Sequence, residues 1–221
     1  MQTFDTTAPI TAVLDIPAGR VQFIAADRAD TVVEVVPADA SKGRDVKVAE
    51  QTRVEYADGV LRIEASAKNQ YLGPSGSIEV TVRLPAGSRV EAKAASAEFR
   101  AVGRFGDFVF EGSHGSIKLD EAASARLTTL DGDISVGRLN GPAEITTGRG
   151  AIRIAEAMRG MVTLRTEAGD VSVGAAHGVS ASLDAGTSYG RIHNALKNTE
   201  GAADLTIHAT TAYGDIAARS L

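Results

Sequence analysis

Apolar and polar residues alternate over most of this chain, and the alternation is organised around a repeated glycine. Six glycines are each followed, two residues later, by isoleucine or valine: Gly115, Gly132, Gly150, Gly169, Gly190 and Gly214. Successive copies are 17, 18, 19, 21 and 24 residues apart. A step near 20 residues with small drift is typical of a β-solenoid, a stack of β-coils. The pattern therefore predicts an all-β fold of the parallel β-helix type, with coils of about 17–24 residues.

Three copies can be superimposed almost without gaps, at residues 126–136, 144–154 and 163–173. Each has an apolar residue five positions before its glycine and two alternating apolar residues after it. Alternation at period two is typical of a strand with one buried face. We expect one internal column of Leu127, Ile145, Leu164 and Leu183, and a second column of the isoleucines and valines that follow the glycines. The Thr, Ser and Arg residues between them are expected to face solvent.

The glycines are expected to lie in turns, where a positive φ suits a residue without Cβ. Asp133, Asp170 and Asp215 each follow a repeat glycine directly, and aspartate favours turns because its carboxylate bonds nearby backbone. Tyr189 and Tyr213 precede the glycines of the two longest copies. We expect these rings to cap a wider turn, with a binding role as the alternative.

Residues 1–88 lack the glycine period but still predict strands, over residues 32–36, 54–56, 60–65 and 78–84. Residues 57–59 predict a hairpin turn, and residues 38–44 and 67–77 predict loops. We expect these early strands to pair antiparallel and to cap a solenoid formed by residues 89–221, within one continuous domain. No long helix is expected; only residues 94–100 and 155–158 have any helical character.

Composition and charge narrow the function. The net charge of −5 argues against a nucleic-acid partner, which requires a basic patch. The chain has no cysteine, so thiolate chemistry and disulfides are excluded. The first residues lack the basic and apolar regions of a signal peptide, and no segment approaches the roughly 20 apolar residues of a membrane span. We therefore expect a cytoplasmic protein without a membrane span, and surface exposure stays open.

No catalytic, metal or cofactor residue emerges from the sequence. His114, His177, His193 and His208 form no close pair of the kind that binds zinc. Two coils would place Asp133 and Asp170 roughly 9–10 Å apart, near the range of an inverting glycosidase. Their turn positions already explain both carboxylates, and a chain without tryptophan lacks the aromatic platform of a sugar site.

The segments RLTTLDGDISV (126–136) and LRTEAGDVSV (164–173), with LPAG at residues 84–87 and the all-β first third, resemble the bacterial family DUF4097. Its members are labelled putative adhesins or β-strand repeat proteins. The resemblance implies a β-solenoid-like fold with no established catalytic activity, cofactor or site residue. We therefore expect a non-catalytic structural or interaction protein. The alternatives are a regulatory or sensing scaffold that binds a protein or cell-envelope ligand on its strand face and a glycan-active β-helix enzyme.

The end of the predicted stack suggests a partner. A terminal coil leaves backbone N–H and C=O groups unpaired, and these invite another strand. Few residues follow the final isoleucine of the repeat, Ile216. We therefore expect self-association through the last coil, residues 205–216.

Overall fold

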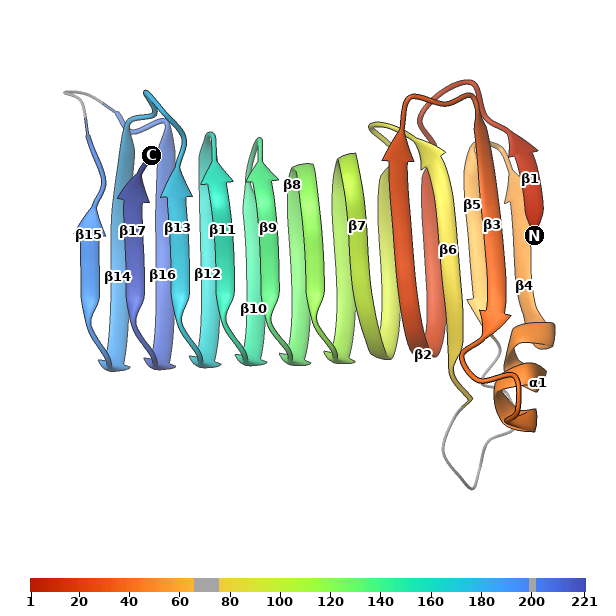
Figure 1. Ribbon diagram of the computed structural model, residues 1–221. Coiled ribbons are helices and arrows are strands. Elements are labelled where there is room, and N and C mark those ends of the chain that lie inside the picture. The colour runs from red at the N-terminus through yellow and green to blue at the C-terminus, as the bar shows by residue number, and fades with distance from the viewer. Residues whose placement is uncertain (66–75, 199–201) are drawn as a thin grey trace. The chain divides into compact units, whose positions relative to one another are not determined.

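The computed structural model describes residues 1–65, 76–198 and 202–221, and it confirms an all-β fold (Figure 1). The chain forms two compact units, Met1–Gly115 and Ser116–Leu221. Within the described residues, the regular elements are strands apart from the single helix α1 (Gly43–Gln51). That helix was not predicted, and it extends beyond the end of the loop expected at residues 38–44.

The second unit contains ten strands: β8 (Ile117–Asp131), β9 (Ile134–Leu139), β10 (Ala143–Arg149), β11 (Ile152–Ala157), β12 (Gly160–Ala168), β13 (Val171–Ala175), β14 (Ala181–Tyr189), β15 (Ile192–Ala195), β16 (Leu205–Tyr213) and β17 (Ile216–Ser220). They form two rows of parallel strands. The second half of β8 begins a row that continues through β10, β12, β16 and β14. The first half of β8 begins the other row, which continues through β9, β11, β13, β17 and β15. A turn at each repeat glycine links the two rows, as the period predicts.

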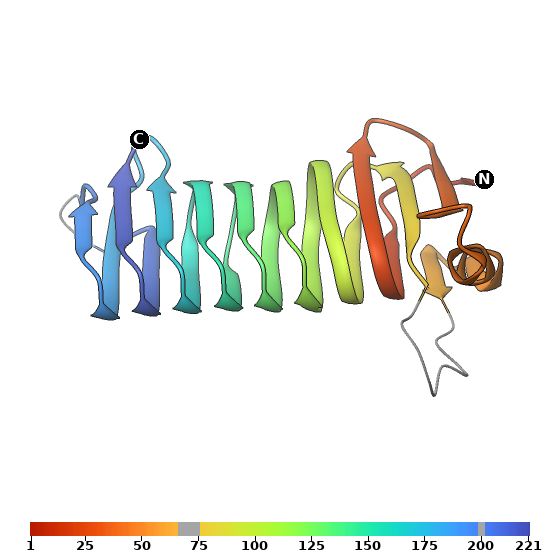
Figure 2. The same cartoon turned by 60° about the horizontal axis from the view of Figure 1, so that its bottom comes forward.

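The C-terminal coil lies inside this stack. β16 pairs with β12 on one side and with β14 on the other, and β17 likewise pairs with β13 and β15. Figures 1 and 2 show the same order. The expectation that residues 205–216 end the stack is therefore wrong, because an earlier segment, β14 and β15, occupies the end. The strand edge at this end of the unit therefore belongs to β14 and β15.

The predicted core columns are confirmed except that Leu183 lies outside its column and that Ile192, at the end of the other column, is 47% exposed. The residues that follow the glycines stack in register, from Ile117 through Ile134, Ile152, Val171 and Ile216 to Ile192. Leu127, Ile145 and Leu164 also align and are fully buried. Leu183 does not belong to their column. Ala209 and Ala185 take the next two places, whereas Leu183 stacks on Ile207, two residues earlier in the strand.

The repeat glycines are required by close stacking as well as by turn geometry. Gly132, Gly150, Gly169 and Gly214 have φ angles between 134° and 156°. A Cβ on Gly150 would overlap the carbonyl oxygen of Gly132 in the preceding coil, and the later glycines repeat this arrangement in spatial order. Any side chain at these positions would therefore force neighbouring coils apart.

A column of threonines was wrongly expected to face solvent. From Gly150 onward, a threonine three residues before the repeat glycine points inward, and its hydroxyl donates to the glycine carbonyl of the neighbouring coil. Thr147 Oγ1 bonds Gly132 O at 3.2 Å, and Thr166 Oγ1 bonds Gly150 O at 3.1 Å. Thr211 and Thr187 make the same contact with Gly169 and Gly214. These side chains join the turns of adjacent coils.

The first unit contains seven strands besides α1: β1 (Gln2–Asp5), β2 (Thr11–Ala26), β3 (Asp30–Pro37), β4 (Thr52–Ala57), β5 (Val60–Ala65), β6 (Ile78–Pro85) and β7 (Arg89–His114). The antiparallel pairing expected here holds for β1 with β3, β3 with β6 and β4 with β5. The turn at Asp58 and Gly59 has positive φ at both residues, as a tight hairpin requires.

The core of the first unit includes Phe99, whose ring centroid lies 5.6 Å from that of Phe23 and 5.1 Å from that of Phe110.

β2 differs from the predicted antiparallel layer. It pairs parallel with β5, β6 and β7, so it forms a coil between them. This pairing places β7 in the first unit, which ends at Gly115, whereas the boundary predicted from the sequence falls at residues 88 and 89. The loop predicted at residues 67–77 lies largely outside the described residues. None of the helices described is long and apolar enough to cross a membrane.

Candidate functional site

An open groove of about 430 Å³ crosses the outer face of the second unit. It follows the row of β8, β9, β11, β13 and β17, on positions that alternate with the buried isoleucine column. Ile117 points into the core and Lys118 points out, and the same alternation gives Ser135, Arg153 and Ser172 on the following strands. The strand period therefore determines which side chains line the groove.

The floor of the groove is made of small residues for a structural reason. A Cβ on Gly137 would lie 2.5 Å from the carbonyl oxygen of Asp120, and one on Gly174 would overlap the carbonyl oxygen of Ala155. Larger residues cannot occupy either position without separating the strands. Ser135 and Ser172 add hydroxyl groups to this low surface. The result is a shallow channel with polar atoms on its floor.

Three cations stand along the channel: Lys118, Arg153 and Arg219. Within the described part of the chain, none of them forms an ion pair. Elsewhere in this unit, by contrast, Arg126 pairs with Glu144 and Arg138 with Glu156. The one acid that lines the groove is Asp120, so the groove carries three positive charges against one negative charge.

The strand register sets the spacing of these cations. Lys118 and Arg153 both align with Ser135, so they lie on strands separated by one intervening strand. Arg153 aligns with Ser172, which in turn aligns with Ala217 of β17, and Arg219 lies two residues further along that strand, opposite Gly174. With strands about 4.8 Å apart, successive cations are separated by roughly 10 Å along the stack, and Arg219 is also displaced by two residues along its strand. This spacing suits an extended anionic ligand better than a single small anion.

The carboxylates singled out in the sequence are located at the turns, outside the groove. Asp133 accepts the backbone N–H of Ala151 at 2.8 Å, and Asp170 accepts that of Asp215 at the same distance. Asp215 accepts the backbone N–H of Arg191 at 2.8 Å and pairs with its guanidinium at 3.1 Å. These bonds to Arg191 lower the pKa of Asp215. Each carboxylate therefore links its turn to the next coil.

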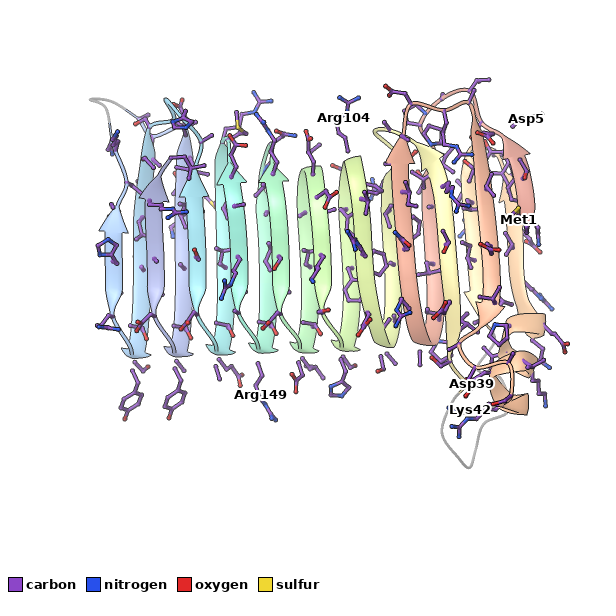
Figure 3. All side chains as sticks on the ribbon, viewed as in Figure 1. Met1, Asp5, Asp39, Lys42, Arg104 and Arg149 are labelled. Atoms are coloured by element: carbon purple, nitrogen blue, oxygen red, sulfur yellow. The ribbon has the colours of Figure 1, made fainter. Side chains whose placement is uncertain are left out.

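The other candidate residues lie on the surface outside the groove. Tyr189 and Tyr213 lie side by side with ring centroids 5.0 Å apart and planes within 3° of parallel, and both rings are largely exposed. Arg149 projects from the same turn edge (Figure 3). His208 contacts Asp184 on the adjacent strand at 3.2 Å. The described residues contain no group of three His, Cys, Asp or Glu side chains able to hold a metal ion.

The groove itself was not predicted. Lys118, Arg153 and Arg219 share no local motif, and they gather only because the coils stack in register. A usable signal was the outward position directly after the second buried residue of each repeat, where Gly137 and Gly174 stand in place of larger residues. That signal indicates a depression in the surface but not the charge around it.

Comparison with known proteins agrees with this architecture. The profile of the family Toastrack DUF4097 matches residues 14–219, and the chain belongs to this family. Among curated proteins, none matches the sequence.

Solved structures that resemble this chain have little sequence in common with it. A putative adhesin from Bacteroides fragilis NCTC 9343 is 11% identical with a TM-score of 0.50, and the match covers 98% of this chain and 95% of that one. A putative adhesin from Parabacteroides distasonis ATCC 8503 is 12% identical with a TM-score of 0.49 over the same shares. A putative lipid binding protein from that organism is 11% identical with a TM-score of 0.39, again over 98% and 95%. At these identities the likeness concerns the fold alone.

Proposed function

We propose that this protein is a non-catalytic binding module whose groove on the second unit holds an extended polyanion. The observation that carries the proposal is the set of three cations Lys118, Arg153 and Arg219, which form no ion pair with any described residue and stand above a floor of small residues. Such a surface also serves the alternative expected from the sequence, a sensing scaffold that takes an envelope ligand on its strand face. A cytoplasmic location remains a prediction from the sequence.

The chemistry of the groove suits phosphate or carboxylate groups spaced along a chain. An arginine guanidinium presents two parallel donors to either group, and lysine adds a point charge. The hydroxyls of Ser135 and Ser172 lie between the cations and are available to the ligand backbone. Because the groove is open, salt screens these contacts, and binding is expected to weaken strongly with ionic strength.

Binding without chemical conversion follows from the same lining. The groove is open to water, and Asp120 is the one carboxylate in its lining, which includes no histidine, so the lining offers no pair of carboxyl or imidazole groups for acid–base catalysis. The repeat carboxylates Asp133, Asp170 and Asp215 are engaged with backbone N–H groups at the turns. We therefore assign the groove a holding role.

The test measures the binding of fluorescently labelled medium-chain polyphosphate by anisotropy at low and high salt, with uncharged dextran as the negative probe. The variant K118S/R153S/R219S removes the three groove cations. The control R126S/R149S/R165S removes three exposed arginines from β8, β10 and β12, so its net charge matches. Three exposed contacts of about 0.5 kcal/mol each predict roughly tenfold weaker binding for the groove variant.

The control is expected to bind like the wild type. Equal losses in both variants would show that net charge alone attracts the probe, which contradicts a defined site. Undiminished binding by the groove variant would contradict the proposal directly.

A further inference from the structure

The strands β14 and β15 form an open end of the second unit. β14 is paired with β16 and β15 with β17, and in the described residues neither is paired with a strand on its other side. The segment after β15 meets the first residue of β14, where Ala181 N–H donates to Lys197 O at 3.1 Å. β14 is nine residues long and regular, so beyond Ala181 it presents a row of backbone N–H and C=O groups with no strand beside them in the described part of the chain. An edge of this kind is a template for another strand.

The same end exposes side chains that belong to the core. Ile192 is 47% exposed, whereas its column neighbours Ile216 and Val171 are each 1% exposed. Leu183 is half-buried, although Ile207, on which it stacks, is fully buried. Both side chains point where a further coil would cover them. The end therefore exposes an apolar surface bordered by hydrogen-bonding backbone.

We propose that a second copy of this chain covers the end and forms a two-fold, end-to-end dimer. β14 and β15 run in opposite directions on the two faces of the coil (Figure 1). A two-fold axis parallel to the strands therefore places β14 of each copy antiparallel to β15 of the other. Both free edges are paired, and Leu183 and Ile192 of the two copies meet in a continuous core. Such an isologous contact closes after two copies.

Charge favours this arrangement over the other two-fold pairing. β14 carries Asp184 near its middle, whereas the β15 side carries His193 and Lys197, and all three side chains are exposed. Pairing β14 with β14 would bring the two Asp184 carboxylates together. Pairing β14 with β15 of the partner places an acidic edge beside a basic one. Arg191, close to the axis, is already neutralised by Asp215 at 3.1 Å.

The tyrosines provide a third point of fit. Tyr213 and Tyr189 stack at the turn edge, and Tyr189 occupies the terminal coil. The outer face of its ring points along the stack, toward the position of the next coil. In the two-fold dimer the two Tyr189 rings face each other and extend the row of stacked rings across the interface.

Analytical ultracentrifugation of the full chain over a range of concentrations tests this inference. The wild type is expected to approach twice the monomer mass of 22.9 kDa at high concentration. Ile192→Lys buries a charge in the interface and is expected to weaken the dimer at least about tenfold. The control Leu130→Lys introduces the same charge at an exposed apolar residue on β8 and is expected to dimerise like the wild type.

A charge exchange provides a second and independent measurement. Asp184→Lys alone and H193E/K197E alone should each weaken the dimer, and the combined variant should recover part of the loss. Circular dichroism checks that every variant is folded. A wild type that stays monomeric at the highest concentrations overturns the proposal, as does an Ile192→Lys variant that dimerises normally. Larger open-ended assemblies would show head-to-tail contacts and also overturn it. The groove variant K118S/R153S/R219S should still dimerise, so this result is separable from polyanion binding.

Discussion

Replacing Gly150 with alanine tests whether glycine stacking sets the distance between coils. The added Cβ would overlap the carbonyl oxygen of Gly132 and lie 2.5 Å from its carbon and 3.0 Å from the nitrogen of Asp133. The φ angle of 134° adds strain of about 1–2 kcal/mol for any residue with a Cβ. Moving the Gly132 carbonyl also breaks its bond from Thr147 Oγ1, which costs about 1 kcal/mol. Together these effects predict a loss of about 3 kcal/mol.

Urea unfolding followed by circular dichroism measures this loss. With a slope of roughly 2 kcal/mol per molar urea, the midpoint should fall by about 1.5 M. Gly186 supplies the matched control, because a Cβ there meets no atom within 4 Å. Gly186→Ala should leave the midpoint nearly unchanged or raise it slightly. If Gly150→Ala and Gly186→Ala had the same midpoint, close stacking at the turn would not be what requires glycine.

Three further predictions address other contacts of the fold. Thr166→Val removes the hydroxyl that donates to Gly150 O and should destabilise the protein by about 1 kcal/mol in urea unfolding, whereas Thr163→Val, at a half-buried position of the same strand, should change little. Asp39 accepts hydrogen bonds from Ser41 and pairs with Lys42 at 3.1 Å beside α1, which lowers the pKa of its carboxyl group to about 2 (Figure 3). Its ionised form therefore stabilises the folded state above about pH 4, and this contribution is lost as the pH falls toward 2. The free energies of unfolding of wild type and Asp39→Asn, measured across an acid titration, should differ by a constant amount above pH 4 and converge near pH 2. Deleting residues 204–221 removes the partner strands of both β14 and β15. Limited proteolysis should then cleave residues 181–195 as readily as an unfolded segment. Protection of that segment in the truncated chain would contradict the pairing.

The coils could be predicted because their determinants are local. Gly132 and Ile134, or Gly169 and Val171, specify a turn and the inward face of the next strand within a few residues. Repetition of such pairs then implies parallel stacking in register. The threonine column was available from the same alignment, since Thr147 and Thr166 stand three residues before their glycines. Its hydroxyls were assigned to solvent because period-two alternation alone does not anticipate a bond between coils.

The order of the coils could not be predicted from the repeat. Every copy satisfies the same stacking rule, so the period leaves open which coil follows which in space. The insertion of β16 and β17 depends on pairing between residues far apart in the chain, such as Leu164 with Ala209. The groove shares this property. Lys118 and Arg219 are 101 positions apart in the sequence, and only the final register places them along one channel.

The inserted coil has a consequence for the order of assembly during synthesis. The segment 181–195 leaves the ribosome before residues 205–220, yet its place in the stack exists only after those later residues have docked against β12 and β13. Coils up to β13 can add one at a time as they emerge, but β14 and β15 must wait. We therefore expect cotranslational folding to pause at this point. It should finish in one step, in which the coil of β16 and β17 and the coil of β14 and β15 join the stack together.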